Sequence, residues 1–123
     1  MKILVFGSNG LVGNSLRRVL DVNKNFKEIF YSSREDTDLF NIENTSKTIS
    51  SIKPDIVINA AAKVGGIHAN NTKRTEFIFQ NLKINMNILE IKWLLLLSID
   101  KNRHIHALKD PPAFSTSCGW VFF

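Results

Sequence analysis

A glycine-rich turn between an expected strand and an expected helix constrains this chain more than any other feature. Residues 3–6 read Ile-Leu-Val-Phe, a short apolar run typical of a buried parallel strand. Gly7, Gly10 and Gly13 follow, and apolar residues then recur at helical spacing from Leu11 to Leu20. The order of strand, glycine turn and helix predicts the first βα unit of an α/β fold.

Each glycine of this turn has its own physical use. The first lets the chain reverse tightly, the second lets backbone approach a ligand, and the third lets the helix pack closely on the strand. The free N–H groups at the start of the helix suit a pyrophosphate. The spacing is Gly-x-x-Gly-x-x-Gly, not the Gly-x-Gly-x-x-Gly of dehydrogenases, so a turn without a ligand is the alternative. The flanking strand and helix favour nucleotide binding, by Gly7, Ser8, Asn9, Gly10, Leu11, Val12 and Gly13.

The second expected strand, residues 28–32, is followed by a basic residue and has no acid at its tip. An Asp or Glu at this place binds the 2′-hydroxyl of NAD, whereas a basic residue accommodates the 2′-phosphate of NADP. Arg34 therefore favours NADP(H) as the cofactor. The alternative is a surface arginine paired with one of the two acids that follow it. Asp38 and Leu39 begin a loop that we expect to pass beside the adenine.

The next segments repeat the alternation of helix and strand. Residues 42–52 have helical spacing, with Asn41 or Asn44 as the N-cap, and Pro54 ends the helix. Residues 55–59, Asp-Ile-Val-Ile-Asn, contain another continuous apolar run, and we expect them to form a third parallel strand. These elements predict a βαβαβ unit and a Rossmann-type three-layer α/β/α fold with a parallel sheet.

Small residues follow the third expected strand. Small side chains at the carboxyl end of a parallel strand leave room for a ligand, so we expect cofactor contacts from Ala60, Ala61 and Ala62. An alanine-rich helix start is the alternative, but Gly65 and Gly66 favour a loop close to a ligand, over residues 63–71. A long helix is expected from Thr72.

Composition and charge exclude several classes of function. The net charge is +5, but the 16 basic residues are scattered, which does not indicate a nucleic-acid surface. His68 has no second ligand at metal-binding spacing, so no metal site is expected. The stretch from Ile88 to Ile99 contains charged residues and is too short to span a bilayer. With one cysteine and no signal peptide before the first strand, we expect a soluble, cytoplasmic protein.

With these residues assembled, the first 90 or so residues resemble the GDP-L-fucose synthase family of extended short-chain dehydrogenase/reductases. The glycine turn at 7–13 is shared by that whole superfamily. The run Ala-Ala-Lys-Val-Gly-Gly-Ile-His-Ala-Asn-Asn at 61–71 is highly specific. The resemblance implies a cofactor of NADP(H) and a nucleotide-sugar substrate, GDP-4-keto-6-deoxy-mannose. It also implies a substrate-side loop that contains Lys63, Val64, Gly65 and Gly66, and a homodimer built through the helix from Thr72.

Members of that family epimerise carbons 3 and 5 of the sugar and then reduce the C4 ketone by hydride transfer. A Tyr-x-x-x-Lys pair supplies the acid for the reduction. This chain has a single tyrosine, Tyr31, and Glu35 stands where the lysine would be. Asn9 replaces a basic residue that is frequent in the family, and Lys73-Arg74 replaces Tyr-Pro. We therefore assign no catalytic residue.

The C-terminal segment departs from the family. The run at 93–98 is either a displaced fourth strand or a continuation of the helix, and residues 101–123 read as neither strand nor amphipathic helix. Ser115 to Cys118 only faintly resembles the family's Gly-Ser-Ser-Cys. We expect a cofactor-binding domain at 1–90 and a divergent tail at 91–123, from truncation or a shifted frame. The expected function is the cofactor-binding portion of the family's enzyme, inactive alone; a non-catalytic NADP(H)-binding module is the alternative.

Overall fold

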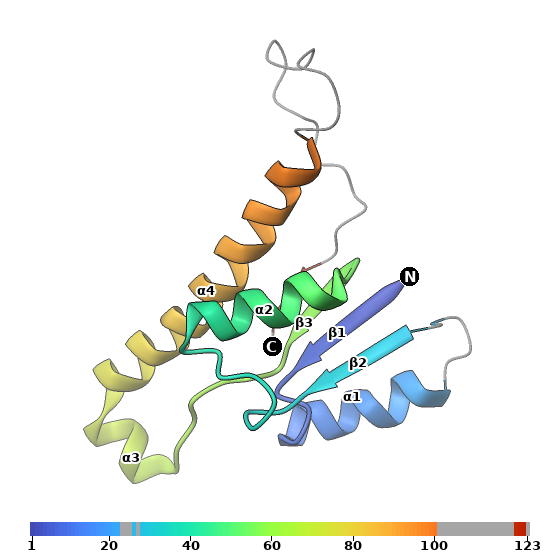
Figure 1. Cartoon of the computed structure of the whole chain (residues 1–123). Coiled ribbons are helices and arrows are strands. Elements are labelled where there is room, and N and C mark those ends of the chain that lie inside the picture. The colour runs from blue at the N-terminus through green and yellow to red at the C-terminus, as the bar shows by residue number, and fades with distance from the viewer. Residues whose placement is uncertain (23–25, 27, 101–119, 123) are drawn as a thin grey trace.

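Parallel strands alternate with helices along residues 1–22, 26, 28–100 and 120–122, the part of the chain that the computed structural model describes (Figure 1). The elements in order are β1 (Lys2–Phe6), α1 (Leu11–Val22), β2 (Glu28–Ser32), α2 (Ile42–Ile52), β3 (Ile56–Asn59), α3 (Ile67–Thr72), α4 (Arg74–Asp100) and β4 (Trp120–Phe122).

The strands form one parallel sheet in the order β2-β1-β3-β4. Leu4 of β1 lies opposite Phe30 of β2 and Val57 of β3, which sets the register on both sides of the central strand. The chain moves to one side of β1 for β2 and to the other side for β3. This reversal is the switch point at which α/β sheets bind ligands.

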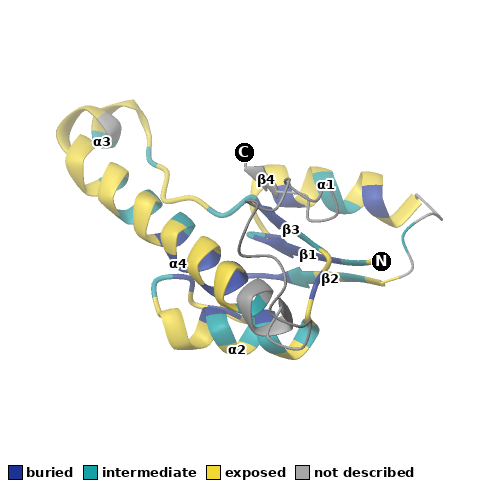
Figure 2. Ribbon diagram, turned by 90° about the horizontal axis from the view of Figure 1, so that it is seen from above, coloured by how far each residue is buried: buried dark blue, intermediate teal, exposed yellow. Residues whose placement is uncertain are grey.

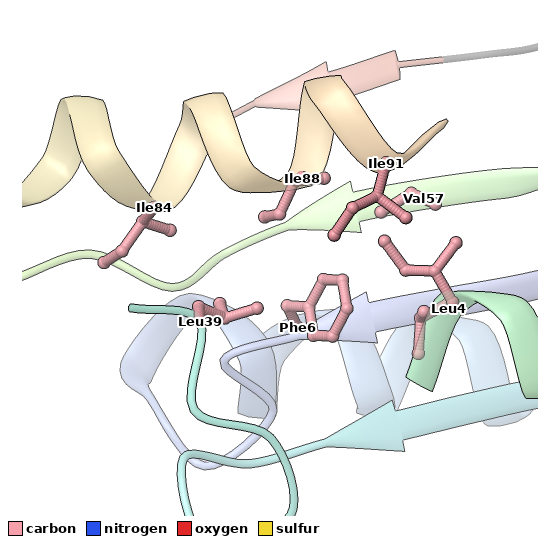
Figure 3. Close-up of a cluster of buried hydrophobic side chains, with 8 residues drawn as sticks. Leu4, Phe6, Leu39, Val57, Ile84, Ile88 and Ile91 are labelled. Carbon is pink, nitrogen blue, oxygen red and sulfur yellow. The ribbon is translucent and has the colours of Figure 1, made fainter. Parts of the chain in front are cut away.

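Helices cover both faces of the sheet. Figure 2 shows α1 on one face and α2 and α4 on the other. The apolar run of β1 therefore supplies two cores, because successive side chains point to opposite faces. Leu4 and Phe6 pack with Ile88 of α4 in the larger cluster (Figure 3), whereas Ile3 and Val5 pack with α1. The expected three-layer parallel fold is confirmed as a partial Rossmann-like fold.

The α2 helix has the predicted bounds, and the structure identifies its caps. The side chain of Asn41 accepts hydrogen bonds from the N–H groups of Glu43 and Asn44, so Asn41 is the N-cap. Lys53 adopts the left-handed conformation, with φ of 51°, and donates from its N–H to the carbonyl of Ile49. The helix ends there, just before Pro54, as predicted.

Three expectations from the sequence are corrected. The expected loop over 63–71 is shorter, because α3 begins at Ile67. The expected long helix begins at Arg74 and not at Thr72, and of the two alternatives for 93–98 the continued helix is confirmed, to Asp100, and the displaced strand is excluded. Residues 120–122 do form a strand, β4, which pairs in parallel with β3. Residues 101–119, with the Ser115 to Cys118 segment, lie outside the described residues.

A close backbone contact packs α1 on the glycine turn. A Cβ atom at Gly13 would lie 2.1 Å from the carbonyl oxygen of Gly7 and 2.7 Å from Cα of Ser8. Only glycine allows this approach, which is the role that the sequence predicts for it.

The other end of α1 is linked to β2 through Tyr31. The hydroxyl of Tyr31 donates to Oδ1 of Asp21 at 2.7 Å, and the guanidinium of Arg17 lies 4.5 Å from the centre of the ring. Burial, followed by the hydrogen bond and negative charge of Asp21, raises the pKa of Tyr31 to about 12.

No helix in the described part of the chain is both long enough and apolar enough to cross a membrane.

Replacing Gly13 with alanine should lower the free energy of unfolding by about 1–3 kcal/mol, because the new methyl group overlaps backbone atoms. Gly66→Ala is the matched control, since no atom lies within 4 Å of a Cβ built there and φ is −67°. It should change stability by less than about 1 kcal/mol. Urea unfolding followed by circular dichroism measures both. Equal stabilities of the two variants would contradict the packing described for Gly13.

The tyrosinate absorbance should titrate near pH 12, well above the ordinary tyrosine value of about 10. Tyr31 is the only tyrosine, so the signal reports one group. A folded-state pKa above the unfolded one stabilises the fold below pH 10, and this contribution is lost as the pH rises from about 10 to about 12. Asp21→Asn should lower the midpoint, because it removes the charge that disfavours tyrosinate. A midpoint near 10 in the unaltered chain would rule out the Tyr31–Asp21 contact.

Candidate functional site

A cleft of about 220 Å³ opens at the carboxyl ends of β1, β2 and β3. The segments that follow the three strands supply most of its wall, and α4 contributes one residue. The cleft therefore lies at the switch point of the sheet, where ligands of α/β folds bind. Its lining residues are Gly7, Asn9, Gly10, Ser33, Arg34, Thr37, Asp38, Leu39, Phe40, Ala60, Ala61, Ala62, Lys63 and Ile84.

Gly7 joins the ends of β1 and β3 at the base of the cleft. Its φ is +76°, a left-handed conformation that favours glycine. A Cβ atom there would lie 2.6 Å from the nitrogen of Ala61 and 2.7 Å from the carbonyl carbon of Ala60. The N–H of Ala60 donates to the carbonyl of Phe6 at 3.0 Å, which continues the β1–β3 ladder to the edge of the cleft. Two backbones thus meet without an intervening side chain.

The glycine turn presents the start of α1 at the cleft. The N–H of Gly10 donates to the carbonyl of Gly7, and the carbonyl of Gly10 accepts from the N–H of Asn14, the first such bond of the helix. No acceptor among the described residues pairs with the N–H groups of residues 11–13. Free N–H groups at a helix start, with the positive end of the helix dipole, suit a phosphate or pyrophosphate.

A tight turn after β2 presents Arg34 to the cleft. Both the N–H and the hydroxyl of Ser33 donate to Oδ2 of Asp36, at 2.8 and 2.7 Å. Both bonds lower the pKa of the Asp36 carboxyl below its ordinary value, and the bond from the backbone N–H has the larger effect. Within the described residues, Arg34 makes no ion pair with Glu35 or Asp36. Its exposed guanidinium is therefore available to an anion in the cleft.

Buried hydroxyl groups support this turn from below. Ser32 donates to Oγ1 of Thr37 at 2.9 Å, and the hydroxyls of Thr37 and Thr48 are 2.9 Å apart. Thr48 belongs to α2, so the network connects the tip of β2 to the helix on the other side of the loop. Satisfied networks of buried polar groups keep a backbone in one conformation.

The loop that enters α2 forms a second wall. The carboxylate of Asp38 accepts from the N–H of Phe40 at 3.0 Å, which closes a short turn. Leu39 is buried in the larger core cluster, and its carbonyl accepts from Nδ2 of Asn87 on α4 at 2.8 Å. The turn is thereby anchored to both the core and the long helix.

Two asparagines of α4 hold the segment that follows β3. Nδ2 of Asn59 donates to Oδ1 of Asn85 at 2.7 Å, while Oδ1 of Asn59 accepts from the N–H of Ala61. Oδ1 of Asn81 accepts from the N–H of Lys63 at 2.6 Å, and its Nδ2 donates to the carbonyl of Lys63 at 3.0 Å. One face of α4 therefore fixes the backbone at the third wall of the cleft.

The structure brings most of the predicted residues together. The following predicted residues line the cleft: Gly7, Asn9, Gly10, Arg34, Asp38, Leu39, Ala60, Ala61, Ala62 and, from the substrate-side loop, Lys63. The others lie outside its lining: Ser8 is buried, Leu11 and Val12 are exposed, Gly13 packs under the turn, and Val64, Gly65 and Gly66 lead toward α3.

Sequence reasoning missed several residues that build the cleft. Ser33, Thr37, Phe40 and Ile84 line it, and Asn81 and Asn85 orient its backbone. Polar residues on the inward face of a helix are the signal that would have found the asparagines, because buried polar groups need partners. Of the described residues, no three His, Cys, Asp or Glu side chains lie close enough together to hold a metal ion.

Comparison with known proteins agrees with this geometry. The chain is 42% identical to GDP-L-fucose synthase 1 of Arabidopsis thaliana over 88 residues, which are 72% of this chain and 27% of that protein. It is 36% identical to GDP-L-fucose synthase of Escherichia coli over 88 residues, again 72% of this chain and 27% of the relative. The chain thus spans about a quarter of the length of the curated relatives it matches.

A solved structure has a similar fold. GDP-mannoheptose C4 reductase of Campylobacter jejuni, with NADP bound, matches with a TM-score of 0.67 and 30% identity, over 76% of this chain and 29% of that one. The model of the NAD dependent epimerase/dehydratase family matches residues 3–93. The glycine turn, the cleft at the switch point and this match together show that the chain belongs to the NAD dependent epimerase/dehydratase family.

Proposed function

We propose that residues 1–90 are the NADP(H)-binding portion of a nucleotide-sugar epimerase/reductase, and that residues 91–123 are a divergent tail. The reaction that we propose for the whole enzyme makes GDP-L-fucose from GDP-4-keto-6-deoxy-mannose. The observation that carries the cofactor assignment is one cleft lined both by Gly10, at the glycine turn that leads into α1, and by Arg34. The start of α1 offers free N–H groups to a pyrophosphate, and Arg34 stands at the tip of β2 for a 2′-phosphate. The relatives named GDP-L-fucose synthase support the substrate assignment.

We also propose that this chain does not complete the reaction alone. Reduction in this family needs a tyrosine beside the ketone, and the single tyrosine here lies elsewhere. Tyr31 packs in the cluster on the α1 face, and its hydroxyl is bonded to Asp21. It is not among the residues that line the cleft. Its raised pKa also makes it a poor proton donor near neutral pH.

A non-catalytic NADP(H)-binding module is the second candidate. It is favoured by the same cleft, because no tyrosine is among the described residues that line it. The two candidates differ in what the chain does by itself. Both should bind NADPH, but a module should also stay a stable monomer or dimer, and aggregation of the purified chain through exposed apolar surface would count against it.

NADPH should bind the purified chain saturably and more tightly than NADH. Arg34→Ala should weaken NADPH binding by about tenfold, the effect of losing a hydrogen bond to a charged group, and leave NADH binding unchanged. Arg18→Ala is the matched control, because Arg18 is an exposed arginine of α1 outside the cleft. Fluorescence titration of the nicotinamide measures the binding of both cofactors to the unaltered chain and to each variant. If NADPH fails to bind, or if both arginine variants behave alike, the assignment is wrong.

We also propose that two copies pair through α4. Apolar side chains on its outer face, which Figure 2 shows as largely exposed, recur at alternating intervals of three and four residues: Phe79, Leu82, Met86, Leu89 and Trp93. This spacing is that of a coiled-coil seam. In an antiparallel pair with Met86 opposite Leu89 of the second copy, exposed Lys83 comes within one helical turn of Glu90 of the second copy. The charges beside the seam are thus complementary.

Met86→Lys should weaken self-association by at least about tenfold, because a charge would be buried without a partner in the seam. Val19→Lys serves as the control, since Val19 is an equally exposed apolar residue of α1. Sedimentation velocity across a range of protein concentrations distinguishes the two. A monomeric unaltered chain at all concentrations, or a dimer unaffected by Met86→Lys, would exclude pairing through α4.

A further inference from the structure

We infer that Asn81 is a positioning residue for the nicotinamide half of the cofactor. The inference rests on the proposed NADP(H) binding and assigns to α4 a role within it. Asn81 does not line the cleft; it acts through the backbone of Lys63, which does. Its amide group both accepts from the N–H and donates to the carbonyl of Lys63, at 2.6 and 3.0 Å.

The two bonds fix Lys63, in the middle of a segment without regular secondary structure. Between β3 and α3, residues 60–66 have no regular secondary structure, and Ala62, Lys63 and Val64 are exposed. Asn85 fixes the beginning of this segment through Asn59, and Asn81, one turn earlier on the same face of α4, fixes its middle. Without Asn81, this backbone would have to become ordered when a ligand binds, and that entropic cost reduces affinity.

The order of strands determines which half of the cofactor is affected. The adenosine ribose of a dinucleotide lies at the tip of β2, and its pyrophosphate lies at the glycine turn after β1. Because β3 is on the other side of β1, the nicotinamide half must lie over the end of β3. Lys63 belongs to that end and Arg34 to the other. Asn81 should therefore affect the affinity for the whole cofactor and not the affinity for its adenosine half.

The test compares NADPH with 2′,5′-ADP, which contains only the adenosine half with its 2′-phosphate. Asn81→Ala should weaken NADPH binding by about fivefold or more, comparable to the loss of one ordinary hydrogen bond, and leave 2′,5′-ADP binding unchanged. Arg34→Ala should weaken both ligands. Gln80→Ala, which removes a surface hydrogen bond to Glu76 beside Asn81 on the same helix, should affect neither ligand.

A second measurement tests the contact without any ligand. The amide of Lys63 should exchange its hydrogen faster in Asn81→Ala than in the unaltered chain, as followed by nuclear magnetic resonance. Equal losses for NADPH and 2′,5′-ADP would show a general structural defect and overturn the inference, as would unchanged binding of both. If the unaltered chain binds neither ligand, the proposed function itself fails, and the positioning role fails with it.

Discussion

The contact between Gly7 and the backbone of Ala60 and Ala61 is the constraint on which the rest of the structure depends. It holds the ends of β1 and β3 together at the point where the order of the sheet reverses. A side chain at residue 7 would overlap the peptide between Ala60 and Ala61, with its Cβ 2.6 Å from the nitrogen. Separation of the two strand ends would also break the bond between Ala60 and Phe6. The cleft exists because the strands meet here with backbone alone.

The sequence predicts those parts of the fold whose signals are local. An apolar run indicates β1 and β3, and the α2 helix has a helical repeat between Asn41 and Pro54 that gives both of its ends. The missed elements depend on distant contacts. The α3 helix follows Gly65, which fits beneath Phe77 and Ala69: a Cβ there would lie 2.9 Å from atoms of both. The β4 strand is defined by pairing with β3, and no pattern within its three residues indicates that.

The residues of the candidate site also fall into those that a local signal indicates and those that depend on distant contacts. The glycine turn and Arg34 could be predicted because a motif, and a position within a βα unit, indicate where each residue lies relative to a bound dinucleotide. The residues that hold the walls could not, because each acts across a long separation in the chain. Asn81 reaches Lys63 over 18 residues, and Asn87 reaches Leu39 over 48. Nothing in a linear pattern indicates which backbone group an inward-facing asparagine will meet.

These long-range bonds have a common origin in α4. Ile84, Ile88 and Ile91 anchor the helix in the larger core cluster, so its inward face is held at a fixed height above the sheet. Polar residues that share that face must then find partners, and the nearest unpaired groups are those of loops around the cleft. Lys92 is another buried polar residue of α4 that finds a partner, at the opposite end of the sheet. Its buried ammonium donates to the carbonyl of Pro54.

The cleft is in this sense a continuation of the core. Leu39 and Ile84 belong to the buried cluster and also line the cleft, so a change in core packing would be transmitted to the wall. The α1 face has no equivalent link, since its smaller cluster contains none of the lining residues. Destabilisation of the α2 and α4 face should therefore alter ligand affinity before the chain unfolds. An equal loss of stability on the α1 face should leave the walls in place until the turn itself opens.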